Sequence, residues 1–163
     1  AHMIAQELGL EGQAVEQPEY NLFNRRKMEA EYLSIFQNIG MGTTIWSPLA
    51  SGMLTGKYNN GIPEGSRLSL EDYGWLKEQA LLDHKIAKVK ALSEFSKELG
   101  VQLPTLAIAW CISNPHVTTA ILGATKESQL LENLKALEVL PLLTPEVLAK
   151  IDEIMGTKPE IFR

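Results

Sequence analysis

The sequence predicts an α/β fold with parallel strands, and three observations lead to this expectation. Residues 43–47 and 117–122 are rich in β-branched and apolar side chains, as buried strands usually are, and residues 14–21 also resemble a strand. Elsewhere, apolar residues recur at the spacing of amphipathic helices. Strand and helix signals alternate along the chain, which indicates β/α units whose strands run parallel.

The predicted helices have recognisable beginnings and ends. Gly9, Gly40 and Gly100 each follow an amphipathic stretch and end it. Pro104 suits the first turn of a helix, and Thr144 is suited to be an N-cap because a proline at the first helical position follows it. The predicted helices cover residues 1–8, 28–39, 83–99, 105–113, 126–137 and 144–154.

Composition limits the classes of protein to which this chain can belong. The 163 residues suffice for one domain, and a net charge of −5 argues against nucleic acid as a partner. The single cysteine, Cys111, lies in an apolar run and is expected to be a buried thiol. No run approaches the roughly 20 apolar residues of a membrane span, and no secretory signal is visible. We therefore expect a cytoplasmic setting without direct membrane insertion.

The segment from Gly42 to Lys57 is the most informative part of the sequence. A buried strand ends at Trp46, and a loop of small residues follows and finishes on Lys57. Such a loop leaves backbone N–H groups free and lets an anion approach closely, and a tryptophan at the strand end offers a flat face to an aromatic ring. From the residues alone, an ordinary strand-to-helix connection with an outward lysine is an equally good reading.

Three motifs give the chain a family resemblance. They are GTTIWSPLASGMLTGK at 42–57, AILGATKESQLLEN at 120–133 and VEQPEYN at 15–21. They resemble, respectively, strands seven, eight and six of the aldo-keto reductases, in the branch that includes the β-subunits of voltage-gated potassium channels. Along the chain they follow one another in the order and with the spacing of that family. The resemblance implies a TIM (β/α)8 barrel, of which residues 1–163 form the carboxyl-terminal portion with strands six to eight. A complete barrel takes roughly 250 residues.

The resemblance also implies an NADP(H) site at the mouth of the barrel. Trp46 is expected to stack on the nicotinamide, Gln17 to meet its carboxamide, and Lys57 to pair with a phosphate. Arg67 ends a long loop at 57–70 and is expected to hold the 2′-phosphate end. As a lone arginine it would more often be a solvated surface charge. The segment expected to wrap the pyrophosphate is Ser47, Pro48, Leu49, Ala50 and Ser51, and the adenosine end is Gly123, Thr125, Gln129, Glu132 and Asn133.

Each of these expectations has an alternative in which the residue has no role in binding a ligand. Gln17 could be a polar side chain at a strand end, and the residues after Thr125 could form a plain solvated helix face. Thr125 is expected to begin a helix, whose positive end favours a phosphate. Gln129, Glu132 and Asn133 are expected near one side of that helix. No G-x-G-x-x-G fingerprint of the other common dinucleotide fold is present.

The catalytic residues of the family have no counterpart in this sequence. The family uses a tyrosine acid with a lysine and an aspartate, all from the first half of the barrel, so we assign no catalytic residue and expect the chain to be inactive by itself. Two functions follow from the resemblance. One is NADPH-dependent reduction of a small carbonyl substrate by the complete barrel. The other is a regulatory subunit that binds the cytoplasmic domain of a voltage-gated potassium channel, assembles as a homotetramer and uses bound NADP(H) as a redox sensor.

Overall fold

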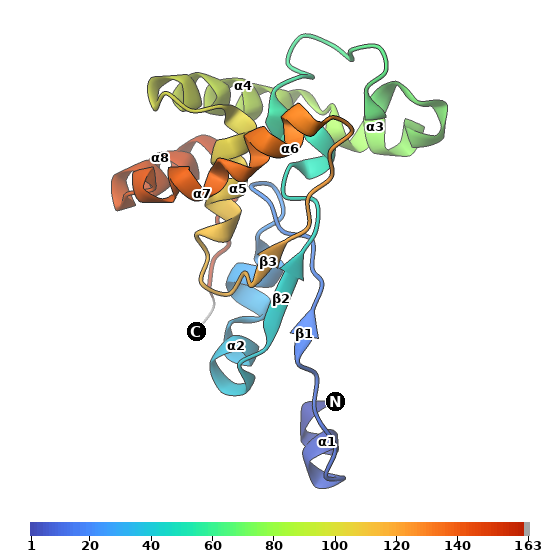
Figure 1. Ribbon diagram of the computed structural model, residues 1–163, viewed down its shortest axis with the longest axis vertical. Helices are drawn as coiled ribbons and strands as arrows, with labels where there is room; N and C mark the ends of the chain where they lie inside the picture. Colours follow the sequence, from blue (N-terminus) through green and yellow to red (C-terminus); the bar gives the residue numbers. More distant parts are fainter. Residues whose placement is uncertain (162–163) are drawn as a thin grey trace.

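Three short parallel strands form the sheet of this chain. The computed structural model describes residues 1–161, apart from the side chain of Gln79, so residues 162–163 of the predicted domain lie outside the described residues. The strands lie in the order β1 (Val15–Glu16), β2 (Gly42–Ile45) and β3 (Thr119–Ala120) (Figure 1). Both pairs, β1 with β2 and β2 with β3, are parallel, which confirms the predicted α/β architecture.

The outer strands are shorter than predicted. The prediction of one strand over 14–21 is wrong, because the β1 ladder stops at Glu16 and only an isolated bridge between Glu19 and Trp46 continues it. Pro18 explains the break, since a proline has no N–H to donate to a ladder, although its carbonyl accepts from the N–H of Trp46 at 3.0 Å. The strand predicted at 117–122 is likewise reduced to β3.

Each predicted helix is present, two of them in divided form. The stretch predicted at 28–39 is a π-helical turn, η1 (Lys27–Glu31), followed by α2 (Leu33–Ile39), and Gly40 ends α2 with a φ of 71°. The stretch predicted at 126–137 divides into α6 (Glu127–Leu134) and α7 (Ala136–Val139). The others are α1 (His2–Glu7), α4 (Asp83–Glu98), α5 (Leu103–Ile112) and α8 (Pro145–Met155).

Several short helices were not predicted from the sequence. The segment after β2 forms a 3₁₀ element, η2 (Ala50–Thr55), and the long loop contains η3 (Arg67–Ser69). Next come η4 (Glu71–Tyr73) and α3 (Gly74–Ala80), and a last turn, η5 (Leu140–Leu142), precedes α8. Their apolar residues do not repeat at helical spacing over a window long enough to signal a helix.

The core of the molecule is built around α5. Helices α4, α6 and α7 and the turn η2 all pack against α5, and α8 packs against α4. These elements gather at the carboxyl ends of the strands, whereas α1 lies beyond their amino ends (Figure 1). The N-cap predicted at Thr144 is confirmed, because its hydroxyl accepts the N–H of Val147 at 3.4 Å.

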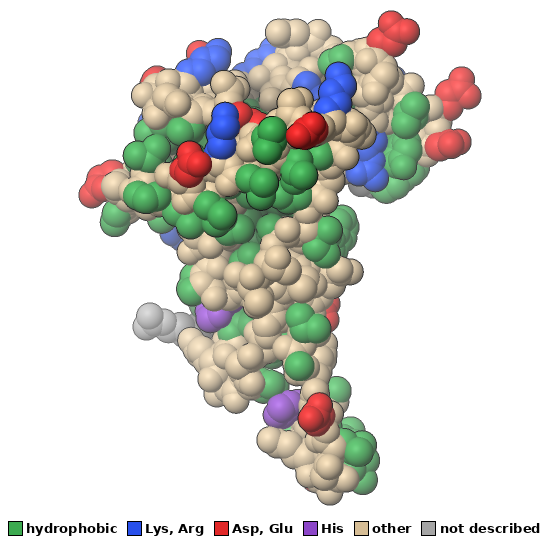
Figure 2. Space-filling view, in the orientation of Figure 1, with side chains coloured by type: hydrophobic (Ala, Val, Ile, Leu, Met, Phe, Trp, Pro, Cys, Tyr) green, Lys and Arg blue, Asp and Glu red, His purple; other side chains and the backbone are tan. Residues whose placement is uncertain are grey.

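Four leucine side chains are exposed along α6 and α7, and together we call them the leucine stripe. Figure 2 shows hydrophobic side chains gathered over these helices. The stripe consists of Leu130, Leu131, Leu134 and Leu137, with exposed fractions between 44% and 64%. Because monomers rarely leave a contiguous apolar patch in water, this face is suited to be covered by another part of a larger structure.

Candidate functional site

The predicted site residues that follow the strands lie at one edge of the sheet. In a parallel sheet the carboxyl ends of the strands meet at the same edge, so Gln17 and Trp46, which follow β1 and β2, come together with the segment after β3. The backbone of Trp46 is fixed on one side, since its carbonyl accepts the N–H of Tyr20 at 3.2 Å. Its indole is 45% exposed, and Gln17 is exposed as well. An open aromatic face therefore stands at this edge.

The loop after Trp46 has an unusual backbone. Ser47, Ala50 and Ser51 have φ values of 56°, 48° and 57°, and they are the non-glycine residues with positive φ in the described chain. Such conformations cost about 1–3 kcal/mol each and persist where the surroundings enforce them, often at functional sites. Here the side-chain amide of Asn21 enforces the first one by donating to the carbonyl of Ser47 at 3.0 Å.

The expectation that this loop leaves its N–H groups free is wrong for at least six of them. The N–H groups of Ala50, Gly52, Leu54 and Gly56 donate to carbonyls within the loop, at 2.9–3.2 Å. The N–H groups of Ser51 and Lys57 donate to the hydroxyl oxygens of Ser47 and Thr55, at 3.2 and 3.3 Å. The tight turns that give the loop its positive φ values also consume these donors. Attraction for an anion therefore has to come mainly from side chains.

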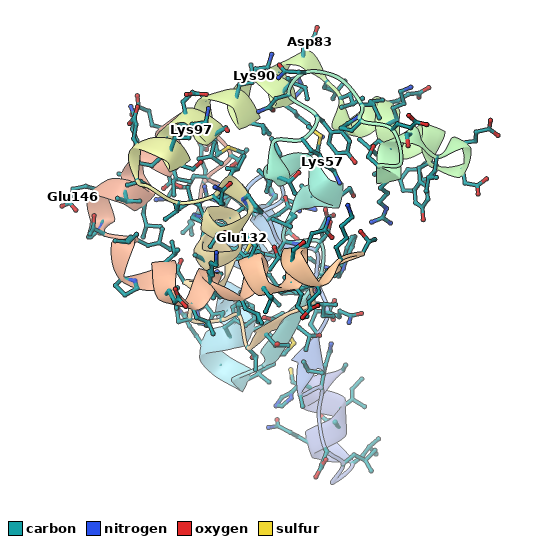
Figure 3. All side chains as sticks on the ribbon, turned by 45° about the horizontal axis from the view of Figure 1, so that its top comes forward. Lys57, Asp83, Lys90, Lys97, Glu132 and Glu146 are labelled. Carbon is teal, nitrogen blue, oxygen red and sulfur yellow. The ribbon has the colours of Figure 1, made fainter. Side chains whose placement is uncertain are left out.

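Lys57 brings a positive charge to the loop. Its ammonium folds back so far that a Cβ placed on Gly52, where φ is 90°, would lie 3.0 Å from the Nζ atom. Lys57, labelled in Figure 3, follows η2, and its ammonium also lies 5.0 Å from the ring centroid of Tyr58. No ion pair of Lys57 occurs in the part of the chain that the structure describes. Glycine at position 52 thus makes room for a cation whose charge is not neutralised within these residues.

The long loop at 57–70 contains buried polar atoms without partners. Four such side-chain atoms occur among the described residues, and three of them lie in this loop: Tyr58 Oη, Asn59 Oδ1 and Ser66 Oγ. Each unsatisfied buried group costs about 1–3 kcal/mol. Native structures leave few such groups, so three along one loop mark a segment whose buried polar atoms the described residues do not satisfy.

Arg67 lies at the beginning of η3, and its guanidinium stacks on an aromatic ring. Its Cζ atom lies 4.9 Å from the ring centroid of Tyr73, and its side chain is exposed. Sequence reasoning missed Tyr73, and the only available signal was an aromatic residue six positions after the arginine.

The segment that leads from β3 into α6 is open and polar. A Cβ at Gly123 would meet nothing within 4 Å, so this glycine leaves space beside the backbone. Thr125 does not begin the helix as expected, because α6 starts at Glu127 with Lys126 as its N-cap. The Gln129 side-chain oxygen instead accepts both the N–H and the hydroxyl of Thr125, at 2.9 and 3.2 Å. This pair fixes the turn that precedes α6.

Glu132 and Asn133, the last two predicted site residues on α6, are less exposed to solvent than Gln129. The carboxylate of Glu132 accepts from the hydroxyl of Thr105 on α5 at 2.9 Å and from Lys135 at 2.7 Å (Figure 3). The bond from Lys135, and then that from Thr105, holds the pKa of Glu132 below its usual value. Asn133 is 5% exposed. The structure thus brings Thr125 and Gln129 into an exposed pair, whereas Glu132 is tied to α5 and Asn133 is buried.

Tyr20, which lies close to this edge of the sheet, is a poor candidate for a catalytic acid. Its hydroxyl donates to Glu29 at 2.7 Å and accepts from Asn114 at 3.2 Å. Burial, followed by the charge of Glu29, raises its pKa far above the usual value for a phenol. Among the described residues there is also no group of three metal-ligating side chains, and no helix has the length and apolar character needed to cross a membrane.

Comparison with known proteins assigns the chain to a family. The sequence model of the Aldo/keto reductase family matches residues 6–155. A probable voltage-gated potassium channel subunit beta from Oryza sativa subsp. japonica is 54% identical over 161 residues, which cover 98% of this chain and 49% of that protein. One of the same description from Arabidopsis thaliana is 55% identical over 157 residues, covering 96% of this chain and 48% of that protein.

The chain therefore belongs to the aldo/keto reductase family. It is similar over nearly its whole length to the two plant proteins described as potassium channel β-subunits, and it spans about half of their length. The resemblance deduced from the three sequence motifs is confirmed at this level.

The residues at the strand edge fit a dinucleotide of the kind this family generally uses. The exposed indole of Trp46 suits an aromatic ring, and the ammonium of Lys57 over Gly52 suits a phosphate. Trp46 and Lys57 thus fit NADP(H), whereas Glu132 is tied to Thr105 and Lys135 and Asn133 is buried, so these two predicted residues are not open to a ligand in this structure.

Proposed function

We propose that this chain is the cofactor-binding, carboxyl-terminal part of an NADP(H)-dependent (β/α)8 barrel. Residues 1–163 supply strands six to eight, and the loop at 57–70 lies on the cofactor side. The observation that carries the proposal is the position of the Lys57 ammonium against Gly52, beside the strained loop that begins at Trp46. A cation held over a turn at the carboxyl edge of a parallel sheet is suited to a phosphate.

Different residues of this chain bind different parts of the cofactor. Trp46 offers its flat face to the nicotinamide, and Gln17, which can donate and accept, fixes the carboxamide and so the face of the ring presented. Ser47, Pro48, Leu49, Ala50 and Ser51 enclose the pyrophosphate with Lys57. Arg67 takes the 2′-phosphate end, and Gly123, Thr125, Gln129, Glu132 and Asn133 form the adenosine end.

The proposed reaction is the reduction of a small aldehyde or ketone. When bound, the reduced cofactor supplies the hydride that the carbonyl carbon accepts. This chain orients the cofactor and contributes no acid, so the reaction needs the tyrosine, lysine and aspartate of the barrel's first half. We therefore expect the isolated chain not to reduce a carbonyl compound.

Titration of the completed barrel with NADPH and NADH, followed by tryptophan fluorescence, tests the binding proposal. Arg67→Ala should weaken NADPH by about ten- to a hundredfold and NADH much less, since a hydrogen bond to a charged group contributes about 1.5–3 kcal/mol. Trp46→Ala, which also lacks one reporter indole, is measured by calorimetry and should weaken both nucleotides alike. Failure of the completed barrel to bind either nucleotide would contradict the proposal.

A second candidate function is regulation of a potassium channel. The two plant relatives are described as probable voltage-gated potassium channel β-subunits, and they match nearly all of this chain. In this alternative the same NADP(H) site reports redox state to the cytoplasmic domain of a channel, and the protein assembles as a homotetramer. Co-purification with such a domain, compared between NADPH and NADP⁺, tests it. Equal recovery with both nucleotides would argue against redox sensing.

A further inference from the structure

Arg67 and Tyr73 form a pair that joins η3, in the long loop, to η4, which follows it. The Arg67 Cζ atom lies 4.9 Å from the Tyr73 ring centroid. The backbone between them is tightly wound, because the N–H of Leu70 donates to Arg67 and that of Tyr73 donates to Leu70, at 3.4 and 3.1 Å. The side chain of Leu68 is 2% exposed and anchors this segment in the core. The pair is therefore held by a folded segment of the chain.

The stacking leaves the guanidinium open to a ligand. A planar guanidinium carries five donors at its edge, and an aromatic ring on one face leaves those donors and the other face accessible. Arg67 is exposed, and no ion pair involves it within residues 1–161. The charge and the donors thus remain available for an anion.

Two neighbouring carboxylates compete with the ring of Tyr73 for the guanidinium of Arg67. Glu71 and Asp72 lie immediately before it on η4, and both carboxylates are exposed. A flexible arginine next to two carboxylates would readily pair with one of them. The stack on Tyr73 holds the guanidinium in a different position, and it also reduces the side-chain entropy lost when a ligand binds.

We propose that Tyr73 is a positioning residue that holds Arg67 for the 2′-phosphate of NADP(H) and so contributes to the preference for NADPH over NADH. This inference rests on the proposed cofactor site. It assigns to Tyr73 no contact with the cofactor. The residue acts through Arg67, by keeping its charge away from Glu71 and Asp72.

The test compares Tyr73→Leu with Tyr73→Phe in the completed barrel, using NADPH and NADH as probes. Loss of an exposed cation–π contact should weaken NADPH about two- to fivefold, which corresponds to roughly 0.5–1 kcal/mol, and leave NADH unchanged. Tyr73→Phe keeps the aromatic face and should bind NADPH as the unmodified barrel does. Trp75→Leu, which removes an exposed aromatic residue from the following helix, is the matched control.

A double variant separates positioning from a general effect on the loop. In an Arg67→Ala background, Tyr73→Leu should cause no further loss of NADPH affinity, because the group that it positions is already gone. Additive losses, an equal loss for NADH, or failure of Tyr73→Phe to restore binding would overturn the inference. If the unmodified barrel binds NADPH and Tyr73→Leu changes nothing, this inference alone fails. If the unmodified barrel binds neither nucleotide, the proposed function fails and this inference with it.

Discussion

Helix α5 and the pair α6–α7 are neighbours with opposite relations to water. Eight of the ten residues of α5 are buried, from Leu103 to Cys111. On α6 and α7, the leucine stripe lies in the solvent, whereas the polar Asn133 is buried. Leu130, Leu134 and Leu137 have the spacing of one helix face. The difference shows that α5 is packed on nearly all sides, whereas α6–α7 present a face that residues 1–161 leave uncovered.

A barrel offers a physical reason for that difference. In the proposed barrel, α6–α7 follow strand eight, which closes the sheet against strand one, so further elements would lie beside them. The chain spans about half the length of its plant relatives. Variants that affect the two regions differently can break or sharpen this comparison.

The largest difference is expected between equivalent truncations in the two regions. Leu106→Ala on α5 removes a side chain that is 0% exposed and should lower the free energy of unfolding by about 2–5 kcal/mol. Leu134→Ala on α6 removes one that is 51% exposed and should change it by no more than about 0.5 kcal/mol. Urea unfolding of both variants measures this. Equal losses would show that the leucine stripe is covered in solution.

A smaller effect is expected at the ion pair that covers one end of α5. The Arg25 guanidinium lies 4.8 Å from the ring centroid of Trp110 on α5 and donates to Asp152 on α8 at 2.7 Å. Burial tends to raise the pKa of Asp152, but hydrogen bonds from Lys158 and Arg25 outweigh it and hold the pKa below its usual value. Asp152→Asn should therefore lower the free energy of unfolding by about 1–2 kcal/mol at pH 7.

The pH dependence of this effect has a definite sign. Because the pKa is lower in the folded than in the unfolded chain, the stabilisation is present above the ordinary carboxyl pKa of about 4 and is lost as pH falls through the folded value. The difference between the Asp152→Asn variant and the unmodified chain should thus shrink below about pH 4. Glu153→Gln is the control, since the exposed pair of Glu153 with Lys150 contributes little. A difference that stays constant down to pH 2 would contradict the assigned cause.

The helix ends give a third comparison, between α8 and α6. Thr144 caps α8 with its hydroxyl, whereas the residue at the same position of α6, Lys126, makes no side-chain cap bond. Thr144→Ala should lower the free energy of unfolding by about 1 kcal/mol, and Thr144→Ser should restore it. Lys126→Ala should be neutral to within about 0.5 kcal/mol. Thermal unfolding by circular dichroism measures all three, and a larger loss for Lys126→Ala would reverse the interpretation.

The sequence predicted these regions to different depths. Its apolar run identified α5 as a helix, and Pro104 marked its beginning, because both signals are local. It also predicted α6, but not which face would be buried, since Glu132 and Asn133 were expected to be open to a ligand. Burial of Asn133 depends on how α6 packs, which is a tertiary property. The strand over 14–21 is shorter than predicted because Pro18 cannot donate to the ladder, an effect that the alternation of side chains does not reveal.

The candidate site was likewise predictable only in part. Trp46 and Lys57 were predicted from the motif, and Trp46 follows β2 directly, whereas Lys57 folds back over Gly52 in the loop beyond it. The satisfied N–H groups of the loop, the fold of Lys57 over Gly52 and the stacking of Arg67 on Tyr73 depend on φ values and side-chain rotamers. Asn21 ends the motif at 15–21, yet its bond to the Ser47 carbonyl joins positions 26 residues apart, and no local pattern predicts such a contact.

The smallest effect on folding is expected from a charge placed in the leucine stripe, which should instead change association. Open strand edges and exposed leucines predict that the isolated chain self-associates. Leu134→Glu should leave the free energy of unfolding within about 0.5 kcal/mol of the unmodified chain, because the added carboxylate remains in water. Sedimentation at several protein concentrations should show less association for Leu134→Glu than for Leu134→Gln, which is equally long but uncharged. If the unmodified chain is a compact monomer with a cooperative thermal transition, the leucine stripe does not drive association, and the contrast between α5 and α6–α7 concerns solubility alone.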